Sequence, residues 1–207
     1  MNPFFTPDHG VLLFCWILYC ALHSVLAAGR WKQWVEQRAG TAFRYYRIGY
    51  SLFATFSLFA LLWYHFTFPA NPSLLNGKLI DYAGIFLTLT GAIIMSVCIH
   101  KYFFNLSGIA IFFKRTAVTT MKLEQDGLHR FTRHPLYLGT LLFSWGLFLL
   151  MPWPQHLIAN VVMTGYIVVA ISWEEKKLLE EFGSAYRDYA ENVPRLLPWK
   201  LKIKNVK

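Results

Sequence analysis

The amino-acid sequence predicts an all-α integral membrane protein: a helical bundle of five transmembrane helices with a cytoplasmic amphipathic helix near the C-terminus. Three observations support this fold class. Of the 207 residues, 56% are hydrophobic and only 15% are charged, which is unusual for a soluble domain. The apolar residues form long runs without charges. Lys and Arg gather between those runs.

Five apolar runs are long enough to cross a bilayer and contain no Asp, Glu, Lys or Arg. They cover residues 11–28, 48–68, 82–99, 136–153 and 157–173. The last two are each about 26 Å long as helices, against a hydrocarbon core of about 30 Å. A weaker patch at 102–113 is too short to cross and contains Asn105 and Ser107, so we interpret it as an interfacial or re-entrant segment.

The distribution of basic residues predicts how the spans are oriented. Lys and Arg are concentrated in residues 29–47, in residues 101–133 and in the tail after Trp173. With five spans, all three regions fall on one side of the membrane. The positive-inside rule places that side in the cytoplasm and the N-terminus outside, in what we expect to be a bacterial inner membrane. The net charge of +9 therefore reflects topology and does not indicate a nucleic-acid partner.

Cysteines and histidines give no sign of a metal or disulfide site. Cys15, Cys20 and Cys98 lie inside predicted spans, and their odd number without a C-x-x-C spacing argues against both. We expect no metal, because the histidines show no paired ligand spacing along a helix. They are His9, His23, His65, His100, His129, His134 and His156.

The chain is predicted to form one domain over residues 1–207, since it has no clear repeat, low-complexity tract or Ser/Gly linker. The fifth helix should continue past Trp173 into the cytoplasm, because residues 174–182 keep helical propensity and an apolar stripe. Gly183 is typical of a helix end and Ser184 of a new N-cap. A short amphipathic helix before Pro194 should then fold back under the bundle.

The last two spans form an antiparallel hairpin, which returns the chain to its starting side. We therefore expect Arg133, His134 and Tyr137 to lie near Glu174 and Glu175, despite the long separation in sequence. Adjacent carboxylates at the membrane end of an apolar helix are costly unless they meet cations or hydroxyls.

Proline is well accommodated in the first turn of a helix, so Pro135 should begin the fourth span. Arg133 and His134 then lie at a helix N-terminus, where free N–H groups and the helix dipole suit an anion such as a carboxylate or phosphate. Gly139 permits close approach of either a ligand or another helix. Taken singly, Arg133 is explained as a positive-inside anchor and the acidic pair as a solvated helix segment. The hairpin that joins the two groups favours a functional site.

These residues resemble the C-terminal half of the isoprenylcysteine carboxyl methyltransferase superfamily, which also contains phospholipid N-methyltransferases. The resemblance covers about residues 124–199 and couples two motifs with a shared tail. Its matching positions are Arg133, His134, Pro135, Tyr137, Gly139, Glu174, Glu175, Leu178, Leu179, Phe182, Gly183, Tyr186, Tyr189, Val193, Pro194, Arg195 and Pro198.

The resemblance implies that S-adenosylmethionine binds at the cytoplasmic ends of the last two spans, in residues 114–199. It implies a cofactor pocket lined by His134, Tyr137, Gly139, Glu174 and Glu175. Either Arg133 or Arg195 is expected to hold the cofactor's carboxylate. Either carboxylate of the acidic pair is expected to hold its ribose.

The front half, residues 1–113, is expected to form the acceptor side. Residues 21–27 and 105–109 resemble the membrane methanethiol S-methyltransferases and related proteins associated with nitrite and nitric oxide reduction. Asn105 stands where those enzymes are expected to carry an aspartate, and Ser107 replaces an aromatic residue, which bears on thiol specificity. His23 lies inside a span, where a histidine is costly unless it is paired, so it is a site candidate.

The resemblance implies a methyltransferase that acts on a small or lipophilic acceptor, with a thiol favoured. Methyl transfer from a sulfonium to a thiolate converts two opposite charges into neutral products, and a pocket without water favours such a reaction. The candidate catalytic residues are Glu174, Glu175, Arg133 and His23, and His100 is a further candidate base. An isoprenylcysteine-type carboxylate, a phospholipid amine and a non-catalytic accessory role stay open as alternatives. The sequence gives no oligomeric state.

Overall fold

The computed structural model describes residues 6–68, 73–107 and 123–197, with residues 102–107 as backbone only. The predicted all-α class is confirmed, because every regular element in these ranges is a helix. The elements are α1 (Pro7–Ala27), α2 (Gly29–Ala39), η1 (Gly40–Tyr45), α3 (Tyr46–Thr67), α4 (Lys78–Ser107), η3 (Gly127–Arg130), α5 (Pro135–Leu150), α6 (Pro154–Phe182) and α7 (Ser184–Asn192).

Each predicted span corresponds to an apolar helix. Four helical segments are long and apolar enough to cross a membrane, and α5 is a shorter apolar helix of 16 residues. At 1.5 Å per residue α5 is about 24 Å long, so it crosses most of a hydrocarbon core. The predicted ends also hold: α5 begins at Pro135, and α6 runs past Trp173 to Phe182.

Two segments differ from the expectation. Residues 29–45, for which no helix is predicted, form α2 and η1, and α2 has no buried residue. Trp31 and Trp34 stack with ring centroids 5.0 Å apart, and the Arg38 guanidinium lies 4.0 Å from the Trp34 ring centroid. An exposed helix with tryptophans and cations suits a membrane interface. The patch predicted as interfacial begins as a continuation of α4 through Ser107, and residues 108–113 lie outside the described residues.

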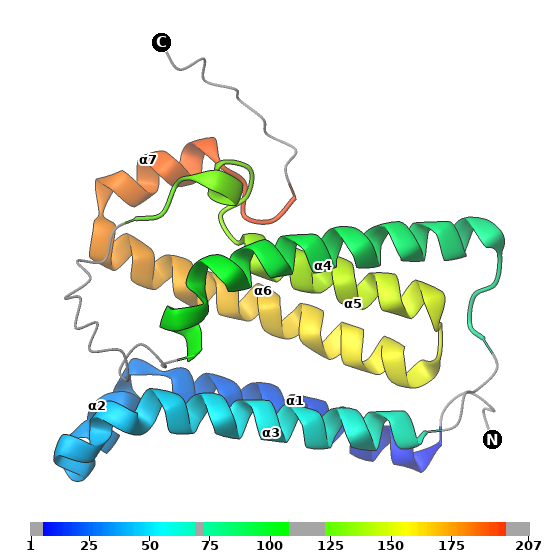
Figure 1. The fold of residues 1–207 in the computed structure, drawn as a ribbon, viewed down its shortest axis with the longest axis horizontal. Helices are drawn as coiled ribbons and strands as arrows, with labels where there is room; N and C mark the ends of the chain where they lie inside the picture. Colours follow the sequence, from blue (N-terminus) through cyan, green and yellow to red (C-terminus); the bar gives the residue numbers. More distant parts are fainter. Residues whose placement is uncertain (1–5, 69–72, 108–122, 198–207) are drawn as a thin grey trace.

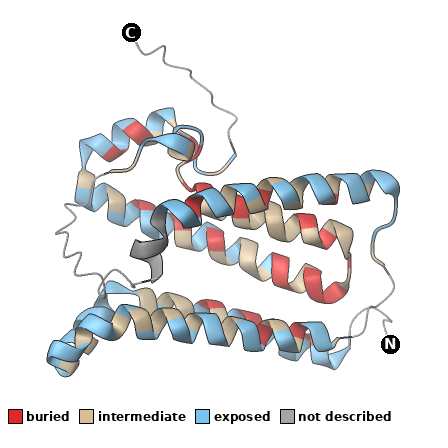
Figure 2. Ribbon diagram, viewed as in Figure 1, coloured by how far each residue is buried: buried red, intermediate tan, exposed pale blue. Residues whose placement is uncertain are grey.

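The helices form two layers (Figure 1): α4, α5 and α6 lie together, and α1 and α3 form the second layer. The core between the layers contains Leu12, Trp16, Leu61 and Ala159, from α1, α3 and α6. Figure 2 shows that buried residues gather on α5 and α6, whereas α3 and α4 expose much of their surface. An exposed apolar surface of this extent is what a lipid-facing bundle requires.

Glycines allow α4 and α5 to approach closely. A Cβ added at Gly91 would lie 2.3 Å from the backbone N of Phe143, and one at Gly146 would lie 2.5 Å from the backbone N of Thr88. Small residues at such contacts let backbones pack directly, which is how membrane helices associate without a hydrophobic driving force. The pair therefore forms a rigid support for the start of α5.

The described parts of the basic regions meet at one end of the bundle. Figure 1 places the end of α1, the start of α3 and the end of α6 at the same side, next to α2 and α7. Lys32 on α2 lies close enough to Arg47 and Lys177 for their charges to interact. Lys101 pairs with Glu124 at 2.8 Å. This grouping agrees with the predicted topology, while the cytoplasmic assignment of this end stays a prediction.

Candidate functional site

The α5–α6 hairpin brings the two predicted polar groups together. Arg133 Nη2 lies 3.1 Å from Glu175 Oε1, and His134 Nε2 lies 3.3 Å from the same oxygen. His134 is the N-cap of α5, and Glu175 follows the apolar part of α6. The expected proximity of these residues is therefore confirmed.

His134 lies between the two carboxylates. Its Nδ1 is 3.7 Å from Glu174 Oε2, while its Nε2 contacts Glu175. The Tyr137 ring stacks on the imidazole with centroids 5.7 Å apart, and the Tyr137 hydroxyl lies close enough to Glu174 for the two groups to interact. The Nε2 atom of His134 is therefore within hydrogen-bond distance of Glu175, whereas Nδ1 faces Glu174 at the longer distance of an ion pair.

The C-terminal tail completes this cluster. The backbone N–H of Arg133 donates to the carbonyl of Pro194 at 2.9 Å, and that of His134 donates to the carbonyl of Arg195 at 3.2 Å. The Thr132 hydroxyl also donates to the Arg195 carbonyl, at 2.9 Å. This pairing holds Arg195 beside Glu175, with Nε 2.8 Å from Oε2.

The helix α7 anchors the tail, as the amphipathic pattern predicted. Tyr186 and Tyr189 are buried, and Gly183 separates α7 from α6 with φ 54°. The Tyr189 hydroxyl donates to the carbonyl of His129 on η3 at 2.8 Å. Burial of the His129 imidazole lowers its pKa, against the opposing charge of Glu124.

Burial divides the cluster into an inner and an outer part. The side chains of Arg133 and Glu175 are only 10% and 9% exposed, whereas those of Glu174 and Arg195 are 45% and 59% exposed. Two guanidinium groups and an imidazole surround Glu175, which favours its ionised form. The inner pair positions the cluster, and the outer carboxylate and guanidinium are accessible to a ligand.

His23 belongs to a second polar group, formed inside the bundle. The Tyr50 hydroxyl of α3 lies 3.0 Å from its Nδ1 and 3.1 Å from its Nε2. Tyr19 and Tyr166 also approach the imidazole, with ring centroids 6.0 and 6.4 Å away. The Ser24 hydroxyl donates to the Tyr166 hydroxyl at 3.2 Å. His23 is therefore paired, as a histidine inside a span requires.

Tyr50 and Tyr166 were not predicted as site residues. Tyr166 and Tyr50 are both close enough to interact electrostatically with Tyr137, and Tyr166 also with Glu174. The two polar groups are thus neighbours. The sequence feature that could have identified them is a tyrosine inside an apolar span, because its hydroxyl needs a hydrogen-bond partner there.

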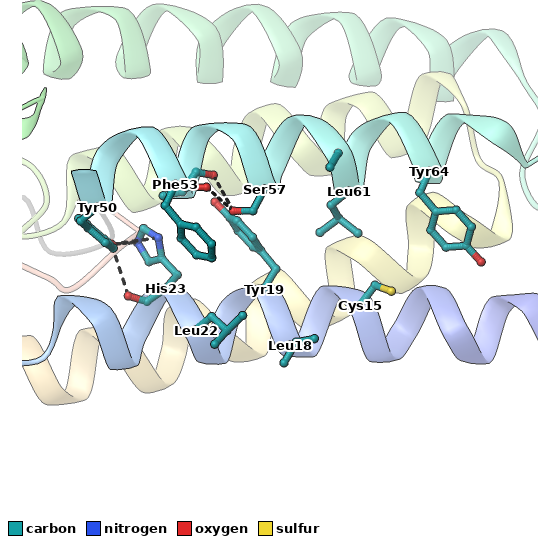
Figure 3. A pocket seen from close by; sticks show the side chains of 12 residues that line it. Cys15, Leu18, Tyr19, Leu22, His23, Tyr50, Phe53, Ser57, Leu61 and Tyr64 are labelled. Carbon is teal, nitrogen blue, oxygen red and sulfur yellow. Dashed lines mark hydrogen bonds between the residues drawn. The ribbon is translucent and has the colours of Figure 1, made fainter. Parts of the chain in front are cut away.

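A cavity of about 290 Å³ lies between α1 and α3 (Figure 3). The His23–Tyr50 pair is at one end, and Cys15 and Tyr64 are toward the other. Most of the remaining lining is aliphatic or aromatic. The Ser57 hydroxyl, although it lines the cavity, donates to the Phe53 carbonyl of its own helix at 2.7 Å. The cavity is therefore apolar apart from its His23 end.

Two other candidates, Gly139 and His100, lie on α5 and α4. Gly139 is on the face of α5 that packs against α4, where an added Cβ would lie 3.1 Å from the backbone N of Met95. Helix packing explains this glycine, and its role toward a cofactor stays a prediction. His100 is exposed on α4. The side chains of Asn105 and Ser107 lie outside the described residues.

Comparisons with known proteins place the chain beside methyltransferases. A family model described as "Protein of unknown function (DUF1295)" matches residues 11–193. The Methanethiol S-methyltransferase 1 of Bradyrhizobium diazoefficiens is 31% identical over 90% of this chain and 65% of its own length. The Methanethiol S-methyltransferase of Mycobacterium tuberculosis is 29% identical over 88% of this chain and 75% of its own length. The chain thus spans about two thirds to three quarters of these relatives.

A more distant similarity covers a smaller part of the chain. The Protein-S-isoprenylcysteine O-methyltransferase B of Arabidopsis thaliana is 35% identical over 79 residues, which are 38% of this chain and 40% of that protein. No solved structure matches the chain. Both groups of relatives are those that the sequence motifs resemble, so the predicted superfamily and branch are confirmed.

Proposed function

We propose that this chain, which belongs to the DUF1295 family, is a membrane methyltransferase that uses S-adenosylmethionine to methylate a thiol. The observation that carries the proposal is the cluster of Arg133, His134, Glu174, Glu175 and Arg195 at the adjoining ends of α5 and α6. Relatives named methanethiol S-methyltransferases support the reaction class and favour a thiol acceptor.

The cluster has the chemistry that S-adenosylmethionine requires. Carboxylates suit ribose hydroxyls, and Glu174 is 45% exposed at the edge of the cluster, where it remains accessible. Guanidinium groups suit the amino-acid carboxylate. Among the described residues, the Nε–H of Arg133 is buried without a hydrogen-bond acceptor, and Arg195 is 59% exposed. An available buried donor beside an accessible carboxylate fits an anionic and hydroxylated ligand.

When bound, S-adenosylmethionine supplies an electrophilic methyl group on a sulfonium. Tyr137, stacked beside His134, presents an aromatic face of the kind that tolerates a cation. The acceptor thiol must lose its proton, since the thiolate is the nucleophile. We assign proton acceptance to a nitrogen of His23, which Tyr50 orients. The apolar helices around His23 exclude water, which favours a reaction that cancels charge.

The proposal places the cluster on the cytoplasmic side, because the basic regions gather at this end of the bundle. The N-terminus is then outside. The protein is proposed to act as an integral membrane protein whose partners are the bilayer and a small or lipophilic methyl acceptor.

Calorimetric titration with S-adenosylhomocysteine tests the cofactor site in purified protein. Loss of a hydrogen bond to a charged group is worth about 1.5–3 kcal/mol, so Glu174→Ala should weaken binding about 10- to 150-fold. His134→Ala should also weaken it. Glu180→Ala, at an exposed position one to two turns further along α6, is the matched control and should bind normally. Absence of binding to the wild type, or equal binding by all variants, would reject the proposal.

A further inference from the structure

The cavity between α1 and α3 is much larger than the smallest thiols need. Its volume is about 290 Å³, compared with about 150 Å³ for an engineered apolar cavity that binds benzene. It therefore has room for about two benzene-sized groups, or about twelve carbon atoms. Methanethiol, with one carbon and one sulfur, would leave most of this space unfilled.

The cavity also has a direction. Its lining on α1 extends from His23 to Cys15, a rise of about 12 Å along the helix. Its only imidazole among the described lining residues is at the His23 end, beside the Tyr50 hydroxyl. The opposite part, around Leu61, is apolar. A ligand with one polar end and an apolar tail matches this arrangement.

The polar end of the cavity adjoins the proposed cofactor cluster. Tyr50, which lines the cavity, lies close enough to Tyr137 for the two to interact, and Tyr137 in turn lies close to Glu174. Tyr166 lies between the two groups, because it contacts the His23 ring and interacts with Glu174. A reactive group held at His23 is thus directed toward the cluster, while a tail attached to it extends away along α1 and α3.

The outer rim of the cavity faces the surface that lipid covers. Leu18 and Phe53 line the cavity and are 42% and 47% exposed. An acceptor dissolved in the bilayer can therefore enter sideways between the two helices, without crossing the aqueous phase.

We infer that this cavity binds the apolar tail of the methyl acceptor, so that the acceptors are thiols with an alkyl or aryl tail of up to about twelve carbons. The inference rests on the proposed function and specifies its substrate class. The reaction forms a bond from the acceptor sulfur to the transferred methyl carbon and breaks the bond from that carbon to the sulfonium. The thiol proton passes to His23, and the products are a methyl thioether and S-adenosylhomocysteine.

A substitution that fills the cavity tests this assignment. Ala54→Phe adds a benzene ring inside the cavity, which takes about half of its volume. Ala21→Phe is the matched control, since Ala21 is exposed on α1 and does not line the cavity. Both variants are assayed in the same membranes with methanethiol and octanethiol, so partition of each thiol into lipid is unchanged.

The expected readout is the ratio of kcat/KM for octanethiol to that for methanethiol. Each methylene excluded from an apolar site lowers the affinity about fourfold. If Ala54→Phe excludes two methylenes of octanethiol, the ratio should fall at least about tenfold. In Ala21→Phe the ratio should stay within about twofold of the wild type. An unchanged ratio in Ala54→Phe, with methyl transfer intact, overturns the inference alone. Absence of methyl transfer to any thiol in the wild type rejects the proposed function as well.

Binding is measured separately, without cofactor or turnover. A photoreactive alkyl methyl thioether should label residues of α1 and α3 that line the cavity, and excess decyl methyl sulfide should displace that labelling. The labelling should be lost in Ala54→Phe and retained in Ala21→Phe. Labelling that excess thioether does not displace would mean that the probe reacts from the bilayer and not from a bound site, which also overturns the inference.

Discussion

Replacement of Glu175 by alanine tests how the cluster is held together. Glu175 contacts Arg133 at 3.1 Å, His134 at 3.3 Å and Arg195 at 2.8 Å. The Glu175→Ala variant leaves the Arg133 guanidinium, only 10% exposed, without this carboxylate. The tail at Arg195 also loses its ionic contact with α6. We therefore expect a large loss of stability from one side chain outside the apolar core.

The magnitude follows from burial. Removal of one partner from a buried ion pair costs about 3–5 kcal/mol, whereas an exposed pair contributes about 0–1 kcal/mol. Arg133 belongs to the first class and Arg195, 59% exposed, to the second. We expect Glu175→Ala to lower the free energy of unfolding by about 3 kcal/mol, roughly 150-fold in the equilibrium constant. Glu174→Ala, at a side chain 45% exposed, should cost less than about 1 kcal/mol.

The assay is reversible unfolding in detergent micelles, followed by circular dichroism, for wild type, Glu175→Ala and Glu174→Ala. A double variant, Arg133→Met with Glu175→Met, should recover most of the lost stability, because it removes both buried charges. Equal stability of Glu175→Ala and Glu174→Ala would mean that the buried pair does not hold the cluster.

Three further predictions concern other parts of the molecule. Gly91→Ala should lower the free energy of unfolding by about 1–3 kcal/mol, because the added Cβ would lie 2.3 Å from a backbone nitrogen. Gly165→Ala should leave the free energy of unfolding unchanged, because the space around Gly165 is open. Tyr50→Phe removes the hydroxyl beside His23 and should slow methyl transfer at least about tenfold in steady-state assays, while Tyr82→Phe, at an exposed position on α4, should have little effect. Burial lowers the pKa of His129 below its ordinary 6.5, so the unfolded chain takes up a proton first as pH falls. Stability should therefore decrease below about pH 6.5 in unfolding titrations, and less steeply in His129→Gln. A similar slope in both proteins would contradict the His129 assignment.

Local patterns in the sequence predicted the position of the main cluster. Pro135 marks the start of α5, and the apolar run that ends at Trp173 determines where Glu174 and Glu175 emerge. Two adjoining spans of similar length must return to one side, so their ends meet whatever the details of packing. The stop at Gly183 and the buried face of α7 follow from equally local signals.

The partners of His23 could not be predicted in the same way. Tyr50 and Tyr166 lie on different helices, and their approach depends on how α1, α3 and α6 rotate about their axes. Because the lipid-facing and protein-facing sides of these helices are both apolar, the sequence gives little information on which side of each helix faces the bundle. For the same reason the sequence could not show that Gly139 faces α4, or that a cavity opens between α1 and α3.

Methyltransferase activity is tested most directly by transfer of labelled methyl from S-adenosylmethionine, with the purified protein in vesicles that contain a panel of thiols, prenylcysteines and phospholipids. We expect label in methyl thioethers, reduced by Glu174→Ala and His134→Ala and retained in Glu180→Ala. Label confined to a prenylcysteine ester would contradict the thiol assignment. Absence of label in every acceptor, together with no binding of S-adenosylhomocysteine, would contradict the central claim that this protein is a methyltransferase.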